Sequence, residues 1–171
     1  MRLLVLAAAL LVPAAAWAQA EPAAPPVAET AYAFGETGLQ VTLPPGWSGP
    51  SAADESRLPA HAVYTFANEV PGPLAGATLR IERVVGLNPV EQELWGQGRS
   101  TRGYGDARPV GPAAAPLPGL ALEVAAGGRA GVIVFFQRGG AFWVAKAEAP
   151  AGVWAARPGD VAAVLASVEV L

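Results

Sequence analysis

The sequence predicts an α+β domain with a central, mostly antiparallel sheet of five to six strands packed with helices. Two observations support this prediction. Several short segments alternate apolar and polar residues or are rich in β-branched and aromatic residues, and Gly- and Pro-rich turns separate them. The last segment of the chain instead repeats apolar residues at helical spacing, which is typical of an amphipathic helix.

The first half of the domain is expected to contain three strands. Residues 39–43 alternate apolar and polar side chains, which predicts a half-buried strand. Residues 61–67 are β-branched and aromatic, and residues 77–85 alternate again, so both segments are expected to be strands. Between them, residues 48–59 are rich in Pro and Ser, and residues 68–76 hold two prolines and two glycines. These two segments are predicted to be a loop and a turn.

A short helix is predicted in the middle of the chain. Asn88 suits the N-cap position and Pro89 the first helical position, because proline lacks the N–H that a helix start leaves unpaired. Residues 96–105 contain four glycines and are predicted to form a loop. Residues 110–118 are rich in Ala and Pro, which favours irregular structure.

Three further strands are predicted close together. Residues 120–125 alternate apolar and polar residues, whereas residues 131–137 are apolar on both faces and are expected to form a central strand covered on both sides. Residues 138–140 hold two glycines, a hairpin signal that joins this strand to residues 141–147.

The C-terminal segment is predicted to be an amphipathic helix that packs on the sheet. Asp160 is expected to be its N-cap. Its apolar residues recur three, four and seven positions apart, at Val161, Val164, Leu165 and Val168.

The N-terminus has the features of a secretory signal peptide. Arg2 precedes an apolar run over residues 3–12, and Ala16-Trp17-Ala18 matches a cleavage site. The apolar run is shorter than the roughly 20 residues of a membrane span. We therefore expect a signal peptide at 1–18, a Pro/Ala-rich spacer at 19–31 and one domain at 32–171. The mature protein is expected to be soluble in the periplasm or outside the cell, without a stable membrane anchor.

Composition excludes several classes of function. The formal net charge is −3 and no basic stripe is present, which argues against a nucleic-acid partner. The chain has no cysteine and His61 is its one histidine, so the usual zinc ligands are missing. No nucleophile motif is found, and His61 is interpreted as a strand-edge residue. We expect no catalytic residues, no metal and no cofactor.

One Gly- and Arg-rich segment, residues 96–108, is a candidate for binding. Its arginines and tyrosine suit an anionic or protein partner, because a guanidinium pairs with carboxylate or phosphate and glycines let backbone N–H groups converge on an anion. The alternative interpretation is a solvated connection. The candidate ligand- or partner-binding residues are Arg99, Arg102, Tyr104 and Arg108.

The order of these elements resembles the PsbP/DcrB-like superfamily. The resemblance lies in a strand ending Leu43-Pro44-Pro45-Gly46-Trp47, a short central helix, a hairpin, and a closing helix that ends Leu165-Ala166-Ser167-Val168. It covers most of residues 32–171. It implies a central antiparallel sheet between helical layers and an accessory or interaction role, since the family has no shared catalytic set.

Three functions remain open from the sequence. The first is a non-enzymatic, exported accessory protein that docks a partner in the cell envelope. The second is a small-molecule carrier with an apolar pocket between sheet and helix, lined by Phe135, Trp143 and Trp154. The third is a hydrolase that uses Glu82 or Glu123, although exposed carboxylates on strands usually form cross-strand ion pairs. The ligand, the partner and the oligomeric state are not predicted.

Overall fold

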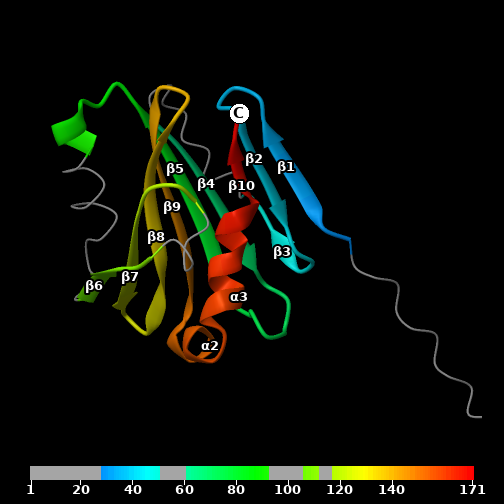
Figure 1. The fold of residues 1–171 in the computed structure, drawn as a ribbon. Helices are drawn as coiled ribbons and strands as arrows, with labels where there is room; N and C mark the ends of the chain where they lie inside the picture. Colours follow the sequence, from blue (N-terminus) through cyan, green and yellow to red (C-terminus); the bar gives the residue numbers. More distant parts are fainter. Residues whose placement is uncertain (1–27, 51–60, 93–105, 112–116) are drawn as a thin grey trace, which may run out of the picture.

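The computed structural model describes residues 28–50, 61–92, 106–111 and 117–171. Its strands form two sheets, one of seven strands in the order β3-β4-β5-β9-β8-β7-β6 and one of three in the order β1-β2-β10 (Figure 1). All pairings are antiparallel. The strands are β1 (Thr30–Phe34), β2 (Leu39–Leu43), β3 (Trp47–Ser48), β4 (His61–Asn68), β5 (Thr78–Val85), β6 (Asp106–Pro109), β7 (Leu120–Ala126), β8 (Arg129–Arg138), β9 (Ala141–Pro150) and β10 (Val168–Val170).

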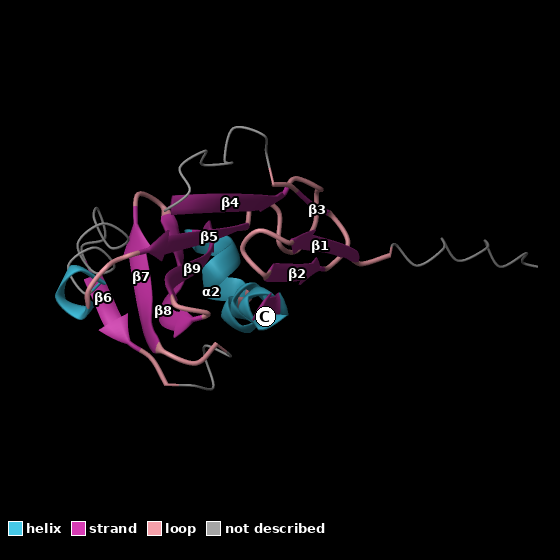
Figure 2. Ribbon diagram, turned by 90° about the horizontal axis from the view of Figure 1, so that it is seen from above, coloured by secondary structure: helices cyan, strands magenta, loops and turns pink. Residues whose placement is uncertain are grey.

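Three helices of the C-terminal region lie on one face of the larger sheet. These are α2 (Ala151–Ala156), α3 (Pro158–Ala163) and the 3-10 helix η2 (Val164–Ser167). The first two contact β8 and β9, and η2 contacts β9 and also β2 of the smaller sheet (Figures 1 and 2). We call this side of the seven-stranded sheet the helix-side face.

The core is divided by the seven-stranded sheet. The larger cluster fills the helix-side face and includes the fully buried Trp143 and Phe66 and the inward residues of β2. It also includes Val161 of α3 and the buried residues of η2. The second cluster lies on the other side, which we call the opposite face, and consists of Val124, Ile133, Phe135, Phe142 and Val144. Because β8 and β9 are buried on both sides, their burial does not alternate.

Several local predictions are confirmed. In β2 the burial alternates as expected, with Leu39, Val41 and Leu43 fully buried. The β8–β9 hairpin turns at Gly139 and Gly140, whose φ angles of 59° and 71° require glycine-like freedom at both positions. Two positive φ angles match the twist of the flanking strands.

The start of the short central helix is also confirmed. Residues 89–92 are helical. The backbone N–H of Glu91 donates to Asn88 Oδ1 at 3.0 Å, and Glu91 Oε2 accepts from the Asn88 N–H at 2.8 Å. This reciprocal pair is a capping box, which supports the assignment of Asn88 as the N-cap.

The architecture differs from the prediction in size and helix content. The main sheet has seven strands instead of five to six, and a second sheet is present. β1 begins at Thr30, two residues before the predicted start of the domain. β6 and α2 were not expected, since α2 contains a glycine and has no buried residue to give it a helical apolar pattern. The predicted signal peptide lies outside the described residues, as does the spacer up to residue 27.

The predicted C-terminal helix is three elements rather than one. α3 ends at Ala163, η2 follows, and Val168 lies in β10, where it pairs with Val41. Val161, Leu165 and Val168 are still buried in one cluster, because the chain keeps the same side toward the core as its conformation changes. The N-cap is Arg157 rather than Asp160, which lies in the first turn and pairs with Arg157.

Candidate functional site

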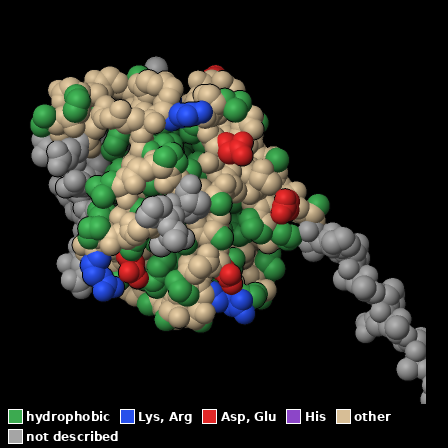
Figure 3. Space-filling model, in the orientation of Figure 1, with side chains coloured by type: hydrophobic (Ala, Val, Ile, Leu, Met, Phe, Trp, Pro, Cys, Tyr) green, Lys and Arg blue, Asp and Glu red, His purple; other side chains and the backbone are tan. Residues whose placement is uncertain are grey.

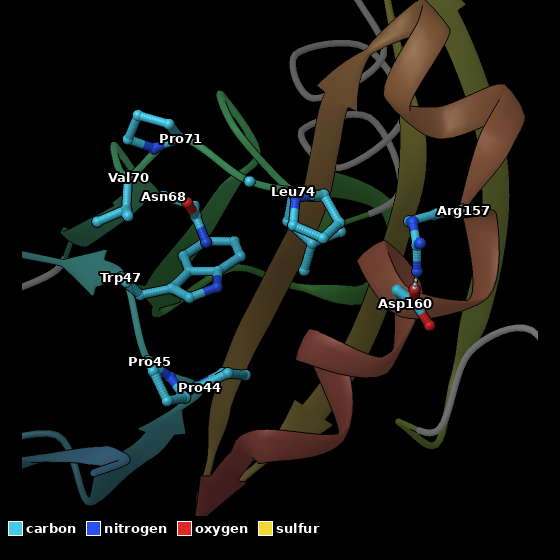
Figure 4. Close-up of a pocket in the computed structure, with 12 residues that line it drawn as sticks. Pro44, Pro45, Trp47, Asn68, Val70, Pro71, Leu74, Arg157 and Asp160 are labelled. Carbon is cyan, nitrogen blue, oxygen red and sulfur yellow. Dashed lines mark hydrogen bonds and ion pairs between the residues drawn. The ribbon is translucent and has the colours of Figure 1, made fainter. Parts of the chain in front are cut away.

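A groove of about 370 Å³ lies at one end of the molecule, where two turns and the α2–α3 junction meet. Figure 4 shows its walls, with prolines on the side of β3, the β4–β5 turn across from them, and an ion pair at the rim. Its lining residues are Pro44, Pro45, Gly46, Trp47, Asn68, Val70, Pro71, Gly72, Pro73, Leu74, Arg157 and Asp160.

The first wall is the turn between β2 and β3. Pro44 and Pro45 end β2, because proline cannot donate to a sheet ladder. Gly46 has a φ of 89°, and a Cβ there would lie 3.4 Å from Val70 Cβ. Glycine therefore lets this turn approach the β4–β5 turn closely enough to form a narrow groove.

Trp47 forms the floor of the groove. Its side chain is only 6% exposed and belongs to the helix-side core. With the Asn68 amide oriented to suit both neighbours, Asn68 Oδ1 accepts from the indole N–H at 3.3 Å and its Nδ2 donates to the Val70 carbonyl oxygen at 3.2 Å. These bonds satisfy a buried amide and hold the two walls in a fixed relation.

The second wall is the turn between β4 and β5. Backbone bonds close it, since the Asn68 N–H donates to Ala77 O and the Gly76 N–H donates to Asn68 O, both at 2.9 Å. Val70 is 53% exposed, and it lies beside Pro71. The wall therefore presents a rigid apolar surface to the solvent.

Among the described lining residues, the charged side chains lie at the rim of the groove. Arg157 Nη1 and Asp160 Oδ2 are 3.0 Å apart, and about half of each side chain is exposed. Figure 3 shows few and scattered charges on the molecular face that carries α3. An apolar groove with one exposed ion pair suits binding of an apolar segment with polar ends.

The structure describes one of the four predicted binding residues. Arg99, Arg102 and Tyr104 lie outside the described residues. Arg108 lies in β6 rather than in a loop, with 76% of its side chain exposed, and its Nη2 is 3.3 Å from Glu123 Oε2. Glu123 Oε1 in turn accepts from the Trp154 indole N–H at 3.3 Å.

The predicted apolar pocket is not assembled by its three residues. Phe135 pairs in register with Val144 and belongs to the opposite-face cluster. Trp143 is fully buried in the helix-side cluster, so the sheet separates the two rings. Trp154 packs against the helix-side cluster from α2. Phe135 and Trp143 lie on neighbouring strands, one register position apart, but their side chains point to different faces of the sheet.

The two candidate carboxylates also lie on different faces. Glu82 is opposite Val144, whereas Glu123 is opposite Val132 of the helix-side cluster. Glu82 accepts from Arg80 Nε at 2.8 Å and lies 3.3 Å from His61 Nε2. A shared site for both carboxylates is therefore not formed. Glu123 has the expected cross-strand ion pair, with Arg108 of β6, whereas Glu82 pairs with Arg80 of its own strand.

Two further kinds of site are not found in the part of the chain that the structure describes. No group of three or more His, Asp or Glu side chains is arranged to hold a metal ion there. Within the same residues, no helix has the length and apolar character needed to cross a membrane.

Comparison with known proteins finds similarity in structure alone. No protein-family model matches the sequence, and a comparison with curated proteins finds no match. The solution structure of CyanoP, the cyanobacterial PsbP of Synechocystis, is similar with a TM-score of 0.54 and 12% sequence identity, over 91% of this chain and 99% of CyanoP. The chain has a PsbP-like fold. The resemblance expected from the sequence is therefore confirmed for the fold.

A second structure shares this PsbP-like fold. The crystal structure of the Ran-binding protein Mog1p of Saccharomyces cerevisiae is similar with a TM-score of 0.52 and 10% identity, over 84% of this chain and 96% of Mog1p. At such low identity, the similarity establishes the arrangement of strands and helices and no residue roles.

Sequence reasoning did not identify the groove. The segment Pro44-Pro45-Gly46-Trp47 belongs to the motif that carries the family resemblance, and residues 68–76 are predicted as a turn. The available signal was that both segments hold two prolines and an adjacent glycine, which stiffens each turn. Their meeting at one end depends on β3 pairing with β4, and a strand of two residues gives no recognisable pattern.

Proposed function

We propose that this PsbP-like protein is an exported, non-enzymatic accessory protein that docks a partner protein of the cell envelope. The groove is the observation that supports the proposal most. It combines rigid proline walls, an exposed Val70 and an ion pair at the rim, which are features of protein interaction surfaces with an apolar centre and a polar edge.

Two other observations agree with the proposal. The signal-peptide pattern at 1–18 favours export. The structural neighbours include a protein named for binding Ran, so this fold is used for protein binding in at least one other case. That similarity supports a binding role in general and gives no information on which partner this chain takes.

The experiment is site-specific photo-crosslinking in the envelope of the host. A benzophenone amino acid is placed at Val70 in the groove and, as a matched control, at Val90, which is 66% exposed near the start of the central helix. Both sites are exposed valines, so both variants should fold like the wild type. A protein-sized adduct from position 70 and none from position 90 is the expected result.

Other patterns of crosslinking would contradict docking at the groove. An adduct from position 90 alone would contradict the groove and favour the Gly- and Arg-rich segment at residues 96–108, which follows Val90 in the sequence. No adduct from either position would contradict docking at these two surfaces.

A small-molecule carrier is the second candidate. A volume of about 370 Å³ lies near the lower end of the range for ligand pockets, so the groove could accept a small apolar compound. In that case a small compound should co-purify with the wild-type protein. The Val70→Trp variant, whose larger side chain fills the groove, should no longer carry the compound, and this loss would distinguish a carrier from a docking protein.

A further inference from the structure

The outer edge of β1 is the least protected strand edge among the described residues. β1 pairs with β2 on one side, and no described strand pairs with the other. Figure 1 shows β1 at the outer margin of the molecule. Its sequence, Thr-Ala-Tyr-Ala-Phe, has five residues without a charge or a proline. Exposed edges of this kind are templates for another strand, and proteins usually block them.

The other three edges are blocked or too short. β3 has two residues. β6 contains Arg108 and ends at Pro109, and charge and proline both oppose strand addition. β10 has three residues, and Arg138 Nε donates to the Val170 carbonyl oxygen at 3.3 Å, which occupies part of its backbone. The open edge of β1 therefore differs from the rest of the described structure.

β1 is held in a fixed position by its aromatic side chains. Tyr32 contacts Phe66 with ring centroids 5.1 Å apart, and Phe34 contacts Tyr64 at 4.3 Å. The outward Ala31 and Ala33 are exposed. An incoming strand would therefore meet a preorganised edge and could place its own inward side chains beside Tyr32 and Phe34.

Charge at the two ends of β1 selects the partner. Glu29 and Glu36 are both exposed, and neither forms an ion pair with a described residue. A second copy paired antiparallel about Tyr32 would bring Glu29 of one chain close to Glu36 of the other at both ends. Glu29 precedes β1 and Glu36 lies in the turn after it, so these carboxylates would flank the paired strands as neighbours rather than as a directly opposed pair. Like charges this close repel each other, so the edge fits a different partner.

The edge is also continuous with the groove. Thr30 is opposite Leu43, the last residue of β2, and Pro44, which follows it in the chain, lines the groove. A strand added to β1 could extend past Thr30 toward the same end of the molecule. Edge and groove together offer more contact than a five-residue edge alone, which is small compared with a stable interface.

We propose that β1 binds its partner by strand addition, and that the partner segment is extended, alternates apolar and polar residues, and has a basic residue near each end. This inference rests on the proposed docking function and specifies the chemistry of the partner. Backbone hydrogen bonds would supply affinity, and the two carboxylates would supply preference.

The test uses two synthetic peptides as probes, Lys-Thr-Val-Thr-Val-Thr-Lys and the same sequence with Glu at both ends. Binding to the mature protein is followed by NMR through the backbone amides of residues 30–34. We expect the basic peptide to shift these amides and slow their exchange, and to bind about tenfold more tightly than the acidic one, because each cross-strand charge pair changes affinity several-fold.

The matched variant is the double substitution Glu29→Lys with Glu36→Lys. Both residues are exposed, so folding should be unaffected, and the preference should reverse toward the acidic peptide. Unshifted β1 amides with both peptides would overturn the inference, as would self-association of the free protein through β1.

The outcomes separate this inference from the proposed function. A crosslink from Val70 with silent β1 amides would overturn strand addition and leave docking at the groove. Shifted β1 amides with no crosslink from Val70 would support strand addition and contradict the groove.

Discussion

The two faces of the seven-stranded sheet differ in what covers them and in what they bury. The helix-side face packs against α2, α3, η2 and the three-stranded sheet, and its cluster is apolar across β4, β5, β9, β8 and β7. On the opposite face, apolar burial is concentrated on β7, β8 and β9, whereas β5 presents Arg80 and Glu82. The helix-side face therefore holds the larger part of the buried apolar core, and its ion pair of Glu123 with Arg108 lies at the β6–β7 edge, whereas Arg80 and Glu82 lie on β5 within the opposite face.

The largest expected effect comes from the helix-side core. Trp143→Ala should lower the free energy of unfolding by about 4 kcal/mol, because it empties a fully buried site. Phe142→Ala, its neighbour on the opposite face, should cost about 3 kcal/mol, since that ring is 7% exposed in a smaller cluster. Urea unfolding of both variants measures the difference. A larger loss for Phe142→Ala would contradict the comparison.

A close approach of two strands should give the next effect. A Cβ on Gly131 would lie against the Ala147 carbonyl oxygen, so Gly131→Ala must separate β8 from β9 and should cost about 2 kcal/mol. Gly152→Ala in α2 is the control, because nothing lies within 4 Å of its Cβ position and alanine favours a helix. Thermal unfolding should show a lower Tm only for the first variant. An unchanged Tm for Gly131→Ala would show that the sheet yields at this point.

The charged part of the opposite face should contribute less. Glu82→Gln removes the ion pair with Arg80 and weakens the contact with His61, and we expect a loss of about 1 kcal/mol because Arg80 is 40% exposed and water screens the pair. Chemical unfolding measures the loss, with Glu91→Gln as a carboxylate control whose amide preserves the capping box. A loss above about 3 kcal/mol would mean that this face contributes as much as the core does.

The smallest effect is expected at the rim of the groove. Arg157→Ala removes the exposed ion pair with Asp160, three residues further along the chain. We expect the free energy of unfolding to change by less than about 0.5 kcal/mol. The same variant should still weaken the Val70 crosslink if the rim contacts the partner. A large loss of stability would make Arg157 a structural residue and remove it from the proposed docking surface.

The sequence predicted the elements that lie within single patterns. The alternation of β2, the hairpin at Gly139 and Gly140, and the Asn88 cap all depend on neighbours in the chain. β1, β3 and β10 were not predicted, because they are short and form only when distant strands supply the other half of each ladder. The C-terminal helix was predicted too long, since Val168 has the same burial in a strand as it would in a helix.

The candidate site was less predictable than the fold. Phe135 and Trp143 were grouped by their size, but the faces to which they point depend on strand register, and a one-residue change in register exchanges the two faces. The groove arises from two turns about 25 residues apart along the chain, and its floor depends on the contact between Trp47 and Asn68. Neither residue alone indicates a binding site.

The most direct test of the docking proposal is native mass spectrometry of tagged mature protein, captured after mild crosslinking from the envelope of its host. The wild type and Val90→Glu should carry an added mass of protein size, and Val70→Glu should lose it, because a charge in an apolar groove opposes binding. A bare monomer for the wild type, or an added mass of only roughly a few hundred daltons, would contradict the proposal that this protein docks a protein partner through the groove.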